Sequence, residues 1–369
     1  MTSPTTFEIY AVATPGLEAP LLAEARQAGF QAGPAEGGIL FPGGWPEVWR
    51  ANLTLRGATR ILVRIGAFRA MHLAQLDKRA RKFPWADFLR SDVAVRVEAT
   101  CRKSRIYHAG AAGQRIARAL GEELGAPVDP LAPITVKVRI EDDLCTISLD
   151  TTGESLHKRG FKQAVAKAPL RETMAAMFLR ECGYRGDEPV LDPMCGSGTF
   201  VIEAAEIALG LQPGRDRDFA FQQLRSFDAA LWQGMKKHAA ARDTPLLFHG
   251  SDRDSGAIRM GVLNAEKAGV AACTRFCNLD IADLEPPEGP PGLVIVNPPY
   301  GARIGNKKPL FGLHARLGQV MRERFSGWRF GMITSDAALA RATGLPFLPP
   351  GPHVAHGGLK VRLYRTGTL

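Results

Sequence analysis

The sequence Asn-Pro-Pro-Tyr, residues 297–300, directly follows the apolar run Leu293–Val296. The side-chain oxygen of Asn297 and the carbonyl of Pro298 can accept hydrogen bonds from the exocyclic amine of a nucleobase and orient its lone pair. Pro298 and Pro299 stiffen the loop, because each ring fixes φ near about −65°. Tyr300 can stack on a base, which would first have to leave a duplex. The four residues therefore predict a catalytic loop that acts on a base amine.

A glycine-containing turn, Asp192 to Thr199, lies between the apolar pair Val190-Leu191 and the helical run Phe200 to Leu209. Glycines let the backbone turn tightly and approach a ligand closely at the carboxyl end of a strand. The turn has neither the Gly-Lys-Ser/Thr of a phosphate loop nor the third glycine of a dinucleotide fingerprint. The Asp192 carboxylate would repel a pyrophosphate but suits an amino group and a sulfonium. The turn thus predicts S-adenosylmethionine as the cofactor rather than NAD.

Two further acids follow apolar strands later in the chain. Asp252 comes after the predicted strand Leu246–His249 and can bind ribose hydroxyls, as in doubly wound nucleotide-binding folds. Asp280 comes after the strand Arg275–Cys277 and can accept a hydrogen bond from the adenine amino group. One such acid alone indicates a helix cap or a solvated loop, but three in this order predict a cofactor site. The predicted cofactor-binding residues are Asp192, Cys195, Gly196, Gly198, Thr199, Asp252, Arg253, Asp280 and Asn297.

The residues after about Lys167 alternate short apolar strands with longer helices, which is typical of a parallel sheet covered on both faces. The predicted strands are Val190-Leu191, Leu246–His249, Arg275–Cys277, Leu293–Val296 and Phe330–Thr334. The segment His353–Arg365, with Gly357-Gly358 at its centre, predicts a closing β-hairpin.

The residues before about Lys167 predict an α+β region, with antiparallel sheets. Its predicted elements are residues 7–13, 17–28, 38–41, 46–55, 61–68, 86–89, 93–99, 111–124, 134–141 and 144–150.

The charge of the chain, +10 overall, points to a polyanionic partner. The excess lies between Thr54 and Leu170, where 21 Lys/Arg stand against 12 Asp/Glu. Cations precede and line the predicted helix 111–124, where its amino-terminal amides could also meet phosphates. The basic stretch at 158–167 fits either a solvated linker or an RNA contact. The predicted RNA-binding residues are Arg102, Lys103, Arg105, Arg115, Lys158, Arg159 and Lys162.

The six cysteines are scattered and follow no export signal, which favours a reducing cytoplasm. No uncharged apolar run is long enough for a membrane span, so we expect no membrane insertion. Cys273-x3-Cys277 and His353-x2-His356 each lack a second pair at zinc-site spacing, so we expect no metal. Cys195 fits a small packing residue beside the cofactor better than a nucleophile.

Together, the turn at Asp192 and the loop at Asn297 resemble those of class I amino-methyltransferases of nucleic acids. The amino half is similar to THUMP-domain RNA methyltransferases. Within that group the chain most resembles the amino-terminal half of bacterial bifunctional large-subunit rRNA methyltransferases that form N2-methylguanosine. The segments that carry this similarity are Arg50-Ala51-Asn52-Leu53 before Ala58-Thr59-Arg60, Ser148-Leu149-Asp150-Thr151-Thr152-Gly153 before Leu156-His157-Lys158-Arg159-Gly160, and Ala168-Pro169-Leu170-Arg171-Glu172-Thr173.

The resemblance implies an α/β fold in three domains. Residues 1–58 would form a ferredoxin-like N-terminal domain and residues 59–160 a THUMP RNA-binding domain, together an α+β unit. Residues 161–369 would form a Rossmann-like class I methyltransferase domain, with a seven-stranded, mostly parallel sheet and a terminal antiparallel hairpin. Because the chain ends after one catalytic domain, the second methyltransferase of the bifunctional proteins is expected to be absent.

The implied function is S-adenosylmethionine-dependent methylation of guanine N2, with 23S rRNA as the first candidate substrate and tRNA as the second. The Asn-Pro-Pro-Tyr loop accepts adenine N6 equally well, while the THUMP-like half favours RNA over DNA. The alternative of another class is an RNA-binding ribosome assembly factor without catalytic activity. Two positions depart from the family pattern on the substrate side: His356-Gly357 replaces Asn-Gly, and Leu313-His314 replaces Leu-Tyr.

Overall fold

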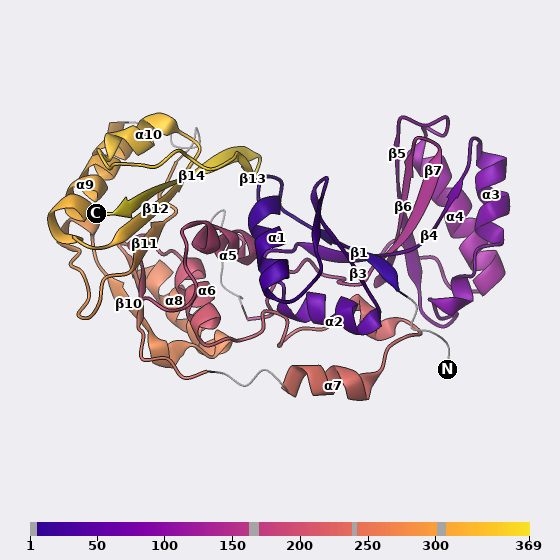
Figure 1. Cartoon of the computed structure of the whole chain (residues 1–369), viewed down its shortest axis with the longest axis horizontal. Helices are drawn as coiled ribbons and strands as arrows, with labels where there is room; N and C mark the ends of the chain where they lie inside the picture. Colours follow the sequence, from indigo (N-terminus) through magenta and orange to yellow (C-terminus); the bar gives the residue numbers. More distant parts are fainter. Residues whose placement is uncertain (1–5, 162–169, 238–241, 301–307) are drawn as a thin grey trace. The chain divides into compact units, whose positions relative to one another are not determined.

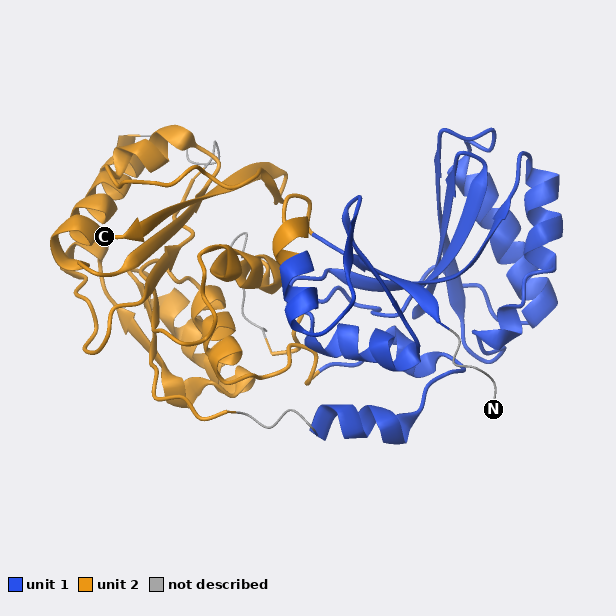
Figure 2. Cartoon of the chain, viewed as in Figure 1, with its two compact units in different colours: residues 1–13, 22–156, 217–238 blue, residues 14–21, 157–216, 239–369 orange. Residues whose placement is uncertain are grey.

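The computed structural model describes residues 6–161, 170–237, 242–300 and 308–369. The chain divides into two compact units whose sequence ranges interleave (Figure 2). Unit 1 contains residues 1–13, 22–156 and 217–238, and unit 2 contains residues 14–21, 157–216 and 239–369.

Unit 1 is built on one seven-stranded sheet in the order β2-β3-β1-β4-β7-β6-β5 (Figure 1). All neighbouring strands are antiparallel except β5 and β6, which are parallel because helix α4 crosses between them. The strands are β1 (Phe7–Val12), β2 (Gly33–Ala35), β3 (Gly38–Gly43), β4 (Arg60–Arg69), β5 (Val95–Arg102), β6 (Ile134–Glu141) and β7 (Leu144–Asp150).

Helix α4 (Ala109–Leu124) shows how sequence sets these elements. Its buried residues Ala112, Ile116, Ala119 and Leu120 recur at helical spacing and form one apolar face. The ring of His108 caps the helix by accepting a hydrogen bond from the Ala111 amide at 3.0 Å, and the helix ends at Gly125, whose φ is 74°. The other helices with residues in unit 1 are α1 (Glu18–Gln27), α2 (Trp45–Thr54), α3 (Leu73–Arg81) and α7 (Ala229–Lys237).

Residues 217–238 belong to unit 1 although they are flanked by unit 2 on both sides. Their aromatic side chains explain this assignment. Phe221 stacks on Trp49 of α2 with ring centroids 5.8 Å apart, and Trp232 of α7 meets Phe221 edge-on at 5.0 Å. All three rings are buried. Aromatic burial on this scale stabilises a segment strongly, so this one is anchored in unit 1.

Unit 2 contains the second seven-stranded sheet, in the order β10-β9-β8-β11-β12-β14-β13. The first five strands are parallel, and β14 runs antiparallel to both β12 and β13. Strand β11 is buried on both faces, as expected at the centre of a covered parallel sheet. The strands are β8 (Val190–Asp192), β9 (Phe248–Asp252), β10 (Thr274–Asn278), β11 (Leu293–Val296), β12 (Arg329–Thr334), β13 (Val354–His356) and β14 (Leu359–Thr368).

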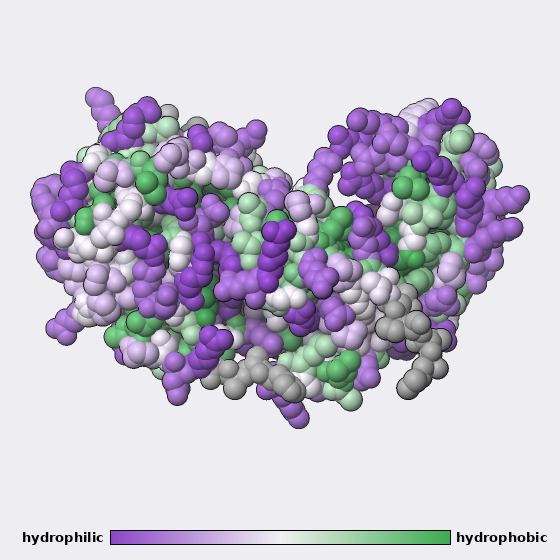
Figure 3. Space-filling view, viewed as in Figure 1, coloured by the Kyte–Doolittle hydropathy of each residue, from purple (hydrophilic) through white to green (hydrophobic). Residues whose placement is uncertain are grey.

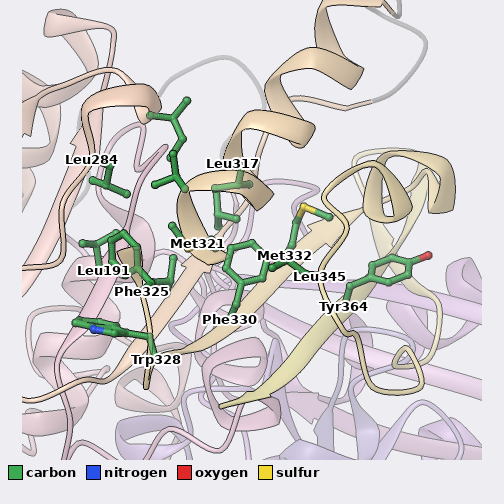
Figure 4. Close-up of a cluster of buried hydrophobic side chains, with 14 of the residues drawn as sticks. Leu191, Leu284, Leu317, Met321, Phe325, Trp328, Phe330, Met332, Leu345 and Tyr364 are labelled. Carbon is green, nitrogen blue, oxygen red and sulfur yellow. The ribbon is translucent and has the colours of Figure 1, made fainter. Parts of the chain in front are cut away.

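Helices cover both faces of this sheet (Figure 1). On one face, Leu317 and Met321 of α9 pack with Phe330 and Met332 of β12 in a large apolar cluster (Figure 4). On the other face, α6 packs against β8 and β9. The helices are α5 (Glu172–Glu181), α6 (Thr199–Ala208), α8 (Ser255–Ala268), α9 (Lys308–Arg324) and α10 (Ala337–Ala342).

The predicted α/β architecture is confirmed, including the mostly parallel sheet and its antiparallel end. Two details of the sequence prediction were wrong. The pair β5–β6 is parallel, and the strand predicted at Leu246–His249 begins at Phe248 and runs to Asp252. The short element predicted at 86–89 is a 3-10 turn at Trp85–Asp87. The three-domain division at 58/59 and 160/161 stays a proposal. No helix in the described ranges is long and apolar enough to cross a bilayer.

Candidate active site

Asp192 is the last residue of β8 and is only 2% exposed. Its Oδ1 accepts a hydrogen bond from the Met194 amide at 3.1 Å. Burial raises the pKa of the Asp192 carboxyl to about 8, and the charge of Asp252 also raises it, while the Met194 amide lowers it. A cation beside this carboxyl would favour the ionised form, so the site is electrostatically suited to a positively charged ligand.

The turn after β8 needs its glycines. Gly196 and Gly198 have φ angles of 52° and 83°, which side chains rarely tolerate. A Cβ at Gly198 would also lie 3.0 Å from the ring of Phe276. Gly198 directly precedes Thr199, the first residue of α6, so the turn leads straight into a helix amino-terminus.

Cys195 lies buried within this turn, and its amide donates to the Ser251 carbonyl at 2.9 Å. Burial raises the pKa of the Cys195 thiol well above its ordinary value, and the neighbouring carboxyls of Asp192 and Asp252 raise it too. A thiol that resists ionisation is a poor nucleophile. These properties suit a packing role for Cys195.

Asp252 and Asp280 stand at the ends of the next two strands. Asp252 ends β9, and its carboxylate accepts the Gly196 amide at 3.0 Å and the Asp254 amide at 2.9 Å. It therefore braces the glycine turn. Asp280 lies two residues after β10 and caps a short 3-10 turn by accepting the Ala282 amide at 3.0 Å. Each acid thus has a local structural role, and each also lines the cavity described below.

The predicted catalytic loop follows the buried strand β11. The Oδ1 atom of Asn297 is buried and has no hydrogen-bond partner within the described ranges. An unpaired buried acceptor is costly unless a ligand satisfies it. Burial raises the pKa of Tyr300 to about 12, so its ring stays a neutral phenol. Gly301, the residue after Tyr300, lies outside the described residues.

A cavity of about 770 Å³ brings the strand-end residues together. Its volume is within the range of cofactor sites. Four predicted cofactor residues line it: Asp252, Arg253, Asp280 and Asn297, joined by the loop residues Pro298, Pro299 and Tyr300. The remaining predicted cofactor residues, Asp192, Cys195, Gly196, Gly198 and Thr199, are not in its wall, although Pro193 and Met194 of the same turn are.

Several lining residues were not predicted. Met194, Leu279 and Ile281 supply an apolar surface. Leu279 and Ile281 flank Asp280 in sequence, and Met194 follows Asp192 by two positions. Closeness to a predicted site residue was therefore the available signal for all three. Leu313 of α9 and the hairpin residues His356–Leu359 also line the cavity. No local pattern marks these as site residues, apart from the family departures at Leu313-His314 and His356-Gly357.

The predicted RNA contacts of unit 1 surround the loop between β5 and α4. Arg102, Lys103, Arg105 and Arg115 are all exposed. Arg102 pairs with Glu36 at 3.1 Å, and Arg105 lies 3.8 Å from Asp143. Residues 102–118 contain five Lys/Arg and no acid. Hydrophilic side chains predominate on the visible face over β5–β7 (Figure 3).

Tyr107 lies in the same loop and is 86% exposed, although sequence reasoning did not select it. An exposed aromatic ring beside cations is typical of surfaces that bind unpaired nucleotides. Its position between Arg105 and His108 was the available signal.

Three comparisons with known proteins bear on this site. Residues 159–346 match the profile described as the RMKL-like methyltransferase domain, residues 8–62 match the RlmL ferredoxin-like domain, and residues 70–150 match the THUMP domain. The chain belongs to the RMKL-like, THUMP-containing methyltransferase family.

The relatives include a candidate RNA methyltransferase of Synechocystis sp., which is 32% identical over 98% of this chain and 97% of its own length. The ribosomal RNA large subunit methyltransferase K/L of Allochromatium vinosum is 35% identical over 88% of this chain but only 47% of its own length. The chain thus spans about half the length of such K/L relatives.

Two solved structures share the fold over nearly the whole chain. A Listeria monocytogenes protein described as a predicted N6-adenine-specific DNA methylase has a TM-score of 0.89 at 28% identity, covering 99% of this chain and 97% of that one. A candidate methyltransferase solved with S-adenosylhomocysteine has a TM-score of 0.88 at 28% identity, covering 100% and 99%. The family match, the RNA methyltransferase relatives and the structure solved with S-adenosylhomocysteine together make the chain an S-adenosylmethionine-dependent RNA methyltransferase.

The residues of this methyltransferase fit that cofactor. Asp252 and Asp280 offer carboxylate oxygens at two adjacent strand ends, where ribose hydroxyls and the adenine amine can be bound. Met194, Leu279 and Ile281 offer an apolar surface for the adenine ring. The described residues include no group of three or more His, Cys, Asp or Glu that could hold a metal ion.

The basic stretch 158–167 includes one residue, Arg159, whose predicted role as an RNA contact conflicts with its burial. Lys158 is exposed, but Arg159 is only 2% exposed and pairs with the buried carboxylate of Glu203 on α6 at 3.4 Å. The prediction of Arg159 as an RNA contact is therefore wrong, because this ion pair holds its charge inside unit 2. Lys162 lies outside the described residues.

We expect Arg159→Ala to lower the free energy of unfolding by about 3–5 kcal/mol, because Glu203 loses its buried counter-charge. Urea denaturation measures the effect, and Lys158→Ala is the matched control, which should change stability by less than about 0.5 kcal/mol. Unchanged stability combined with weaker RNA binding in Arg159→Ala would restore the RNA-contact interpretation.

Proposed function

We propose that this methyltransferase modifies N2 of a guanine in 23S rRNA, in the cytoplasm. The observation that carries the chemistry is the buried Oδ1 of Asn297 in the wall of the cavity, which has no hydrogen-bond partner among the residues that the structure describes. The similarity to ribosomal RNA large subunit methyltransferases K/L supports the choice of substrate. The basic segment 102–118, which runs from the end of β5 into α4 within the residues matched by the THUMP profile, supports binding of a structured RNA.

The residues of the loop would act on the amine rather than on the cofactor. An exocyclic amine is a poor nucleophile because its lone pair is delocalised into the ring. Asn297 Oδ1 and the Pro298 carbonyl would each accept a hydrogen bond from one N–H of this amine, which favours a pyramidal nitrogen. The neutral ring of Tyr300 would stack on the extruded base. Bound S-adenosylmethionine supplies the electrophilic methyl group. Asp252 and Asp280 in the cavity wall would hold the cofactor, and Asp192 would act from behind the wall, where it accepts a hydrogen bond from the amide of the lining residue Met194.

Three alternatives remain distinct from this proposal. The first is the same reaction on tRNA. The second is methylation of adenine N6, because the loop accepts either amine and the Listeria structure carries an adenine-specific description. The third is an RNA-binding ribosome assembly factor without turnover, against which the arrangement of Asp252, Asp280 and Asn297 around one cavity argues.

The deciding experiment is mass spectrometry of nucleosides from rRNA and tRNA of cells with and without the gene. Loss of N2-methylguanosine from large-subunit rRNA would support the proposal. Loss from tRNA would move the substrate to tRNA, and loss of N6-methyladenosine would change the target base. No change in any fraction would favour the assembly factor.

The RNA surface yields a separate prediction. Replacing Arg102, Lys103 and Arg105 together by Glu should weaken RNA affinity and lower the slope of log Kd against log salt, by about 0.7–0.9 for each phosphate that the variant no longer neutralises. Fluorescence anisotropy over a salt series measures both. Arg90→Glu is the matched control, since Arg90 is an exposed arginine of unit 1 paired with Asp92. Equal affinity of the triple variant and the control would place the RNA site elsewhere.

A further inference from the structure

The terminal hairpin carries side chains into the wall of the cavity. Strands β13 and β14 pair with Val354 opposite Val361 and His356 opposite Leu359. Gly357 and Gly358 form the two-residue turn, with φ angles of 55° and 83°. Positive φ at both positions matches the type I′ turn that suits a tight hairpin. This turn fixes the register of the pair.

The register determines which way His356 faces. Directly opposed residues of an antiparallel pair lie on the same face, and so do residues two apart on one strand. Val354 and Val361 are buried at 1% and 0% exposure. His356 and Leu359 therefore belong to the inward face of the hairpin, and both line the cavity.

The start of the hairpin is held by a segment far away in sequence. Gly16 approaches the backbone so closely that a Cβ there would lie 2.2 Å from the carbonyl oxygen of His353. The Ala355 amide donates to the Pro15 carbonyl at 3.4 Å. The chain thus anchors β13 independently of the turn, and His356 sits on a braced strand rather than on a loose loop.

His356 can pair with a base edge in its neutral form. Burial lowers the pKa of the His356 imidazole, and the charge of Arg171 lowers it as well. At neutral pH the ring therefore offers one N–H donor and one nitrogen acceptor. The other polar residues of the wall, including Asp252, Asp280 and Asn297, are assigned above to the cofactor and to the reacting amine.

Guanine and adenine differ at two positions of the Watson–Crick edge when their reactive amines occupy the same place. N1 carries a hydrogen in guanine and a lone pair in adenine, and the position across the edge from the amine differs as well. A guanine bound through N2 presents the acceptor O6 across the Watson–Crick edge. An adenine bound through N6 presents only C2–H there. A buried N–H donor that points at this position would be paired by guanine O6 and left unpaired by adenine. A site strongly disfavours a base that leaves its buried donor unpaired.

We propose that His356 is a specificity-determining residue that donates a hydrogen bond to O6 of the target guanine, with Leu359 packing against the same base. This inference rests on the proposed function, since it assumes a guanine N2 substrate. The hairpin would thereby select the base, while the Asn297 loop positions the amine of either purine.

The test uses the full chain and an RNA fragment that contains the guanine mapped in cells, with a second fragment that carries 2-aminopurine at that position. 2-Aminopurine keeps the reactive amine but lacks O6 and the N1 hydrogen, so only the difference between the two variants on each RNA reports on His356. We expect His356→Ala to lower kcat/KM on guanine RNA about tenfold, the effect of one hydrogen bond, and to leave 2-aminopurine RNA nearly unchanged. His356→Gln, which keeps a donor, should recover part of the loss. Calorimetric affinity for S-adenosylhomocysteine should not change.

His353→Ala is the matched control, because His353 is an exposed histidine three residues earlier and is not in the cavity wall. Equal activity of the two variants on guanine RNA would overturn the proposal, as would an equal loss on both RNAs. Loss of S-adenosylhomocysteine binding in step with activity would also overturn it, since the residue would then support the cofactor site. If the wild type forms no N2-methylguanosine in any RNA, the proposed function fails and this inference with it, a result distinct from the others.

Discussion

Asn297→Ala is expected to lower kcat by about 100- to 1000-fold while the affinity for S-adenosylhomocysteine stays near that of the wild type. The range is that of removing one preorganised polar group from an active site. Asn297 Oδ1 is buried and has no partner within the described ranges, so the substrate amine is the group it is placed to satisfy. Single-turnover methyl transfer and calorimetry measure the two quantities separately.

Asn297→Asp provides the matched control. Aspartate keeps an oxygen acceptor at the same position, so this variant should retain more turnover than Asn297→Ala. Normal turnover in Asn297→Ala would contradict the proposed role of the side chain. A parallel loss of cofactor affinity would instead indicate that Asn297 mainly supports the cofactor.

Asp252→Ala is expected to weaken S-adenosylmethionine binding by about 10- to 100-fold, the loss expected from one or two hydrogen bonds to a charged group. The variant would also release the Gly196 amide, which Asp252 holds at 3.0 Å, so the glycine turn would lose its brace. Because cofactor binding is the affected step, KM for the cofactor should rise more than kcat falls. Calorimetry with S-adenosylhomocysteine measures the affinity directly.

Glu288→Ala controls for the removal of a negative charge, since Glu288 is an exposed acid of unit 2 outside the cavity wall. Its cofactor affinity should match the wild type. Wild-type affinity in Asp252→Ala would remove Asp252 from the cofactor site and leave it only the structural contacts to Gly196 and Asp254.

The strand-end residues were predictable from sequence for a physical reason. Parallel strands finish at the same edge of a sheet, so acids that follow apolar runs must meet there. Asp252, Asp280 and Asn297 are far apart in sequence, yet all three line one cavity. The parallel pair β5–β6 could also have been predicted, because a helix between two strands is the pattern of a crossover connection.

Other features depend on contacts that no local pattern reveals. Arg159 lies beside Lys158 in a basic stretch, and only its contact with Glu203, 44 residues later, shows that it is buried. His356 lines the cavity because of a hairpin register and a backbone contact with Gly16. The sequence places the aromatic residues of 217–238 in the predicted catalytic half. Only the stacking of Phe221 on Trp49 shows that this segment belongs to unit 1.

That aromatic segment also limits how the protein can be taken apart or recombined. The chain leaves the residue range of unit 2 at 217 and returns to it after 238, so no single cut separates the two units. A fragment beginning at residue 161 would carry Phe221 and Phe227 without Trp49, which contacts both rings, and exposed apolar surface of this kind favours aggregation. In modular terms, each unit is assembled from three stretches of the chain, so a domain swap must exchange three separate stretches of gene at once.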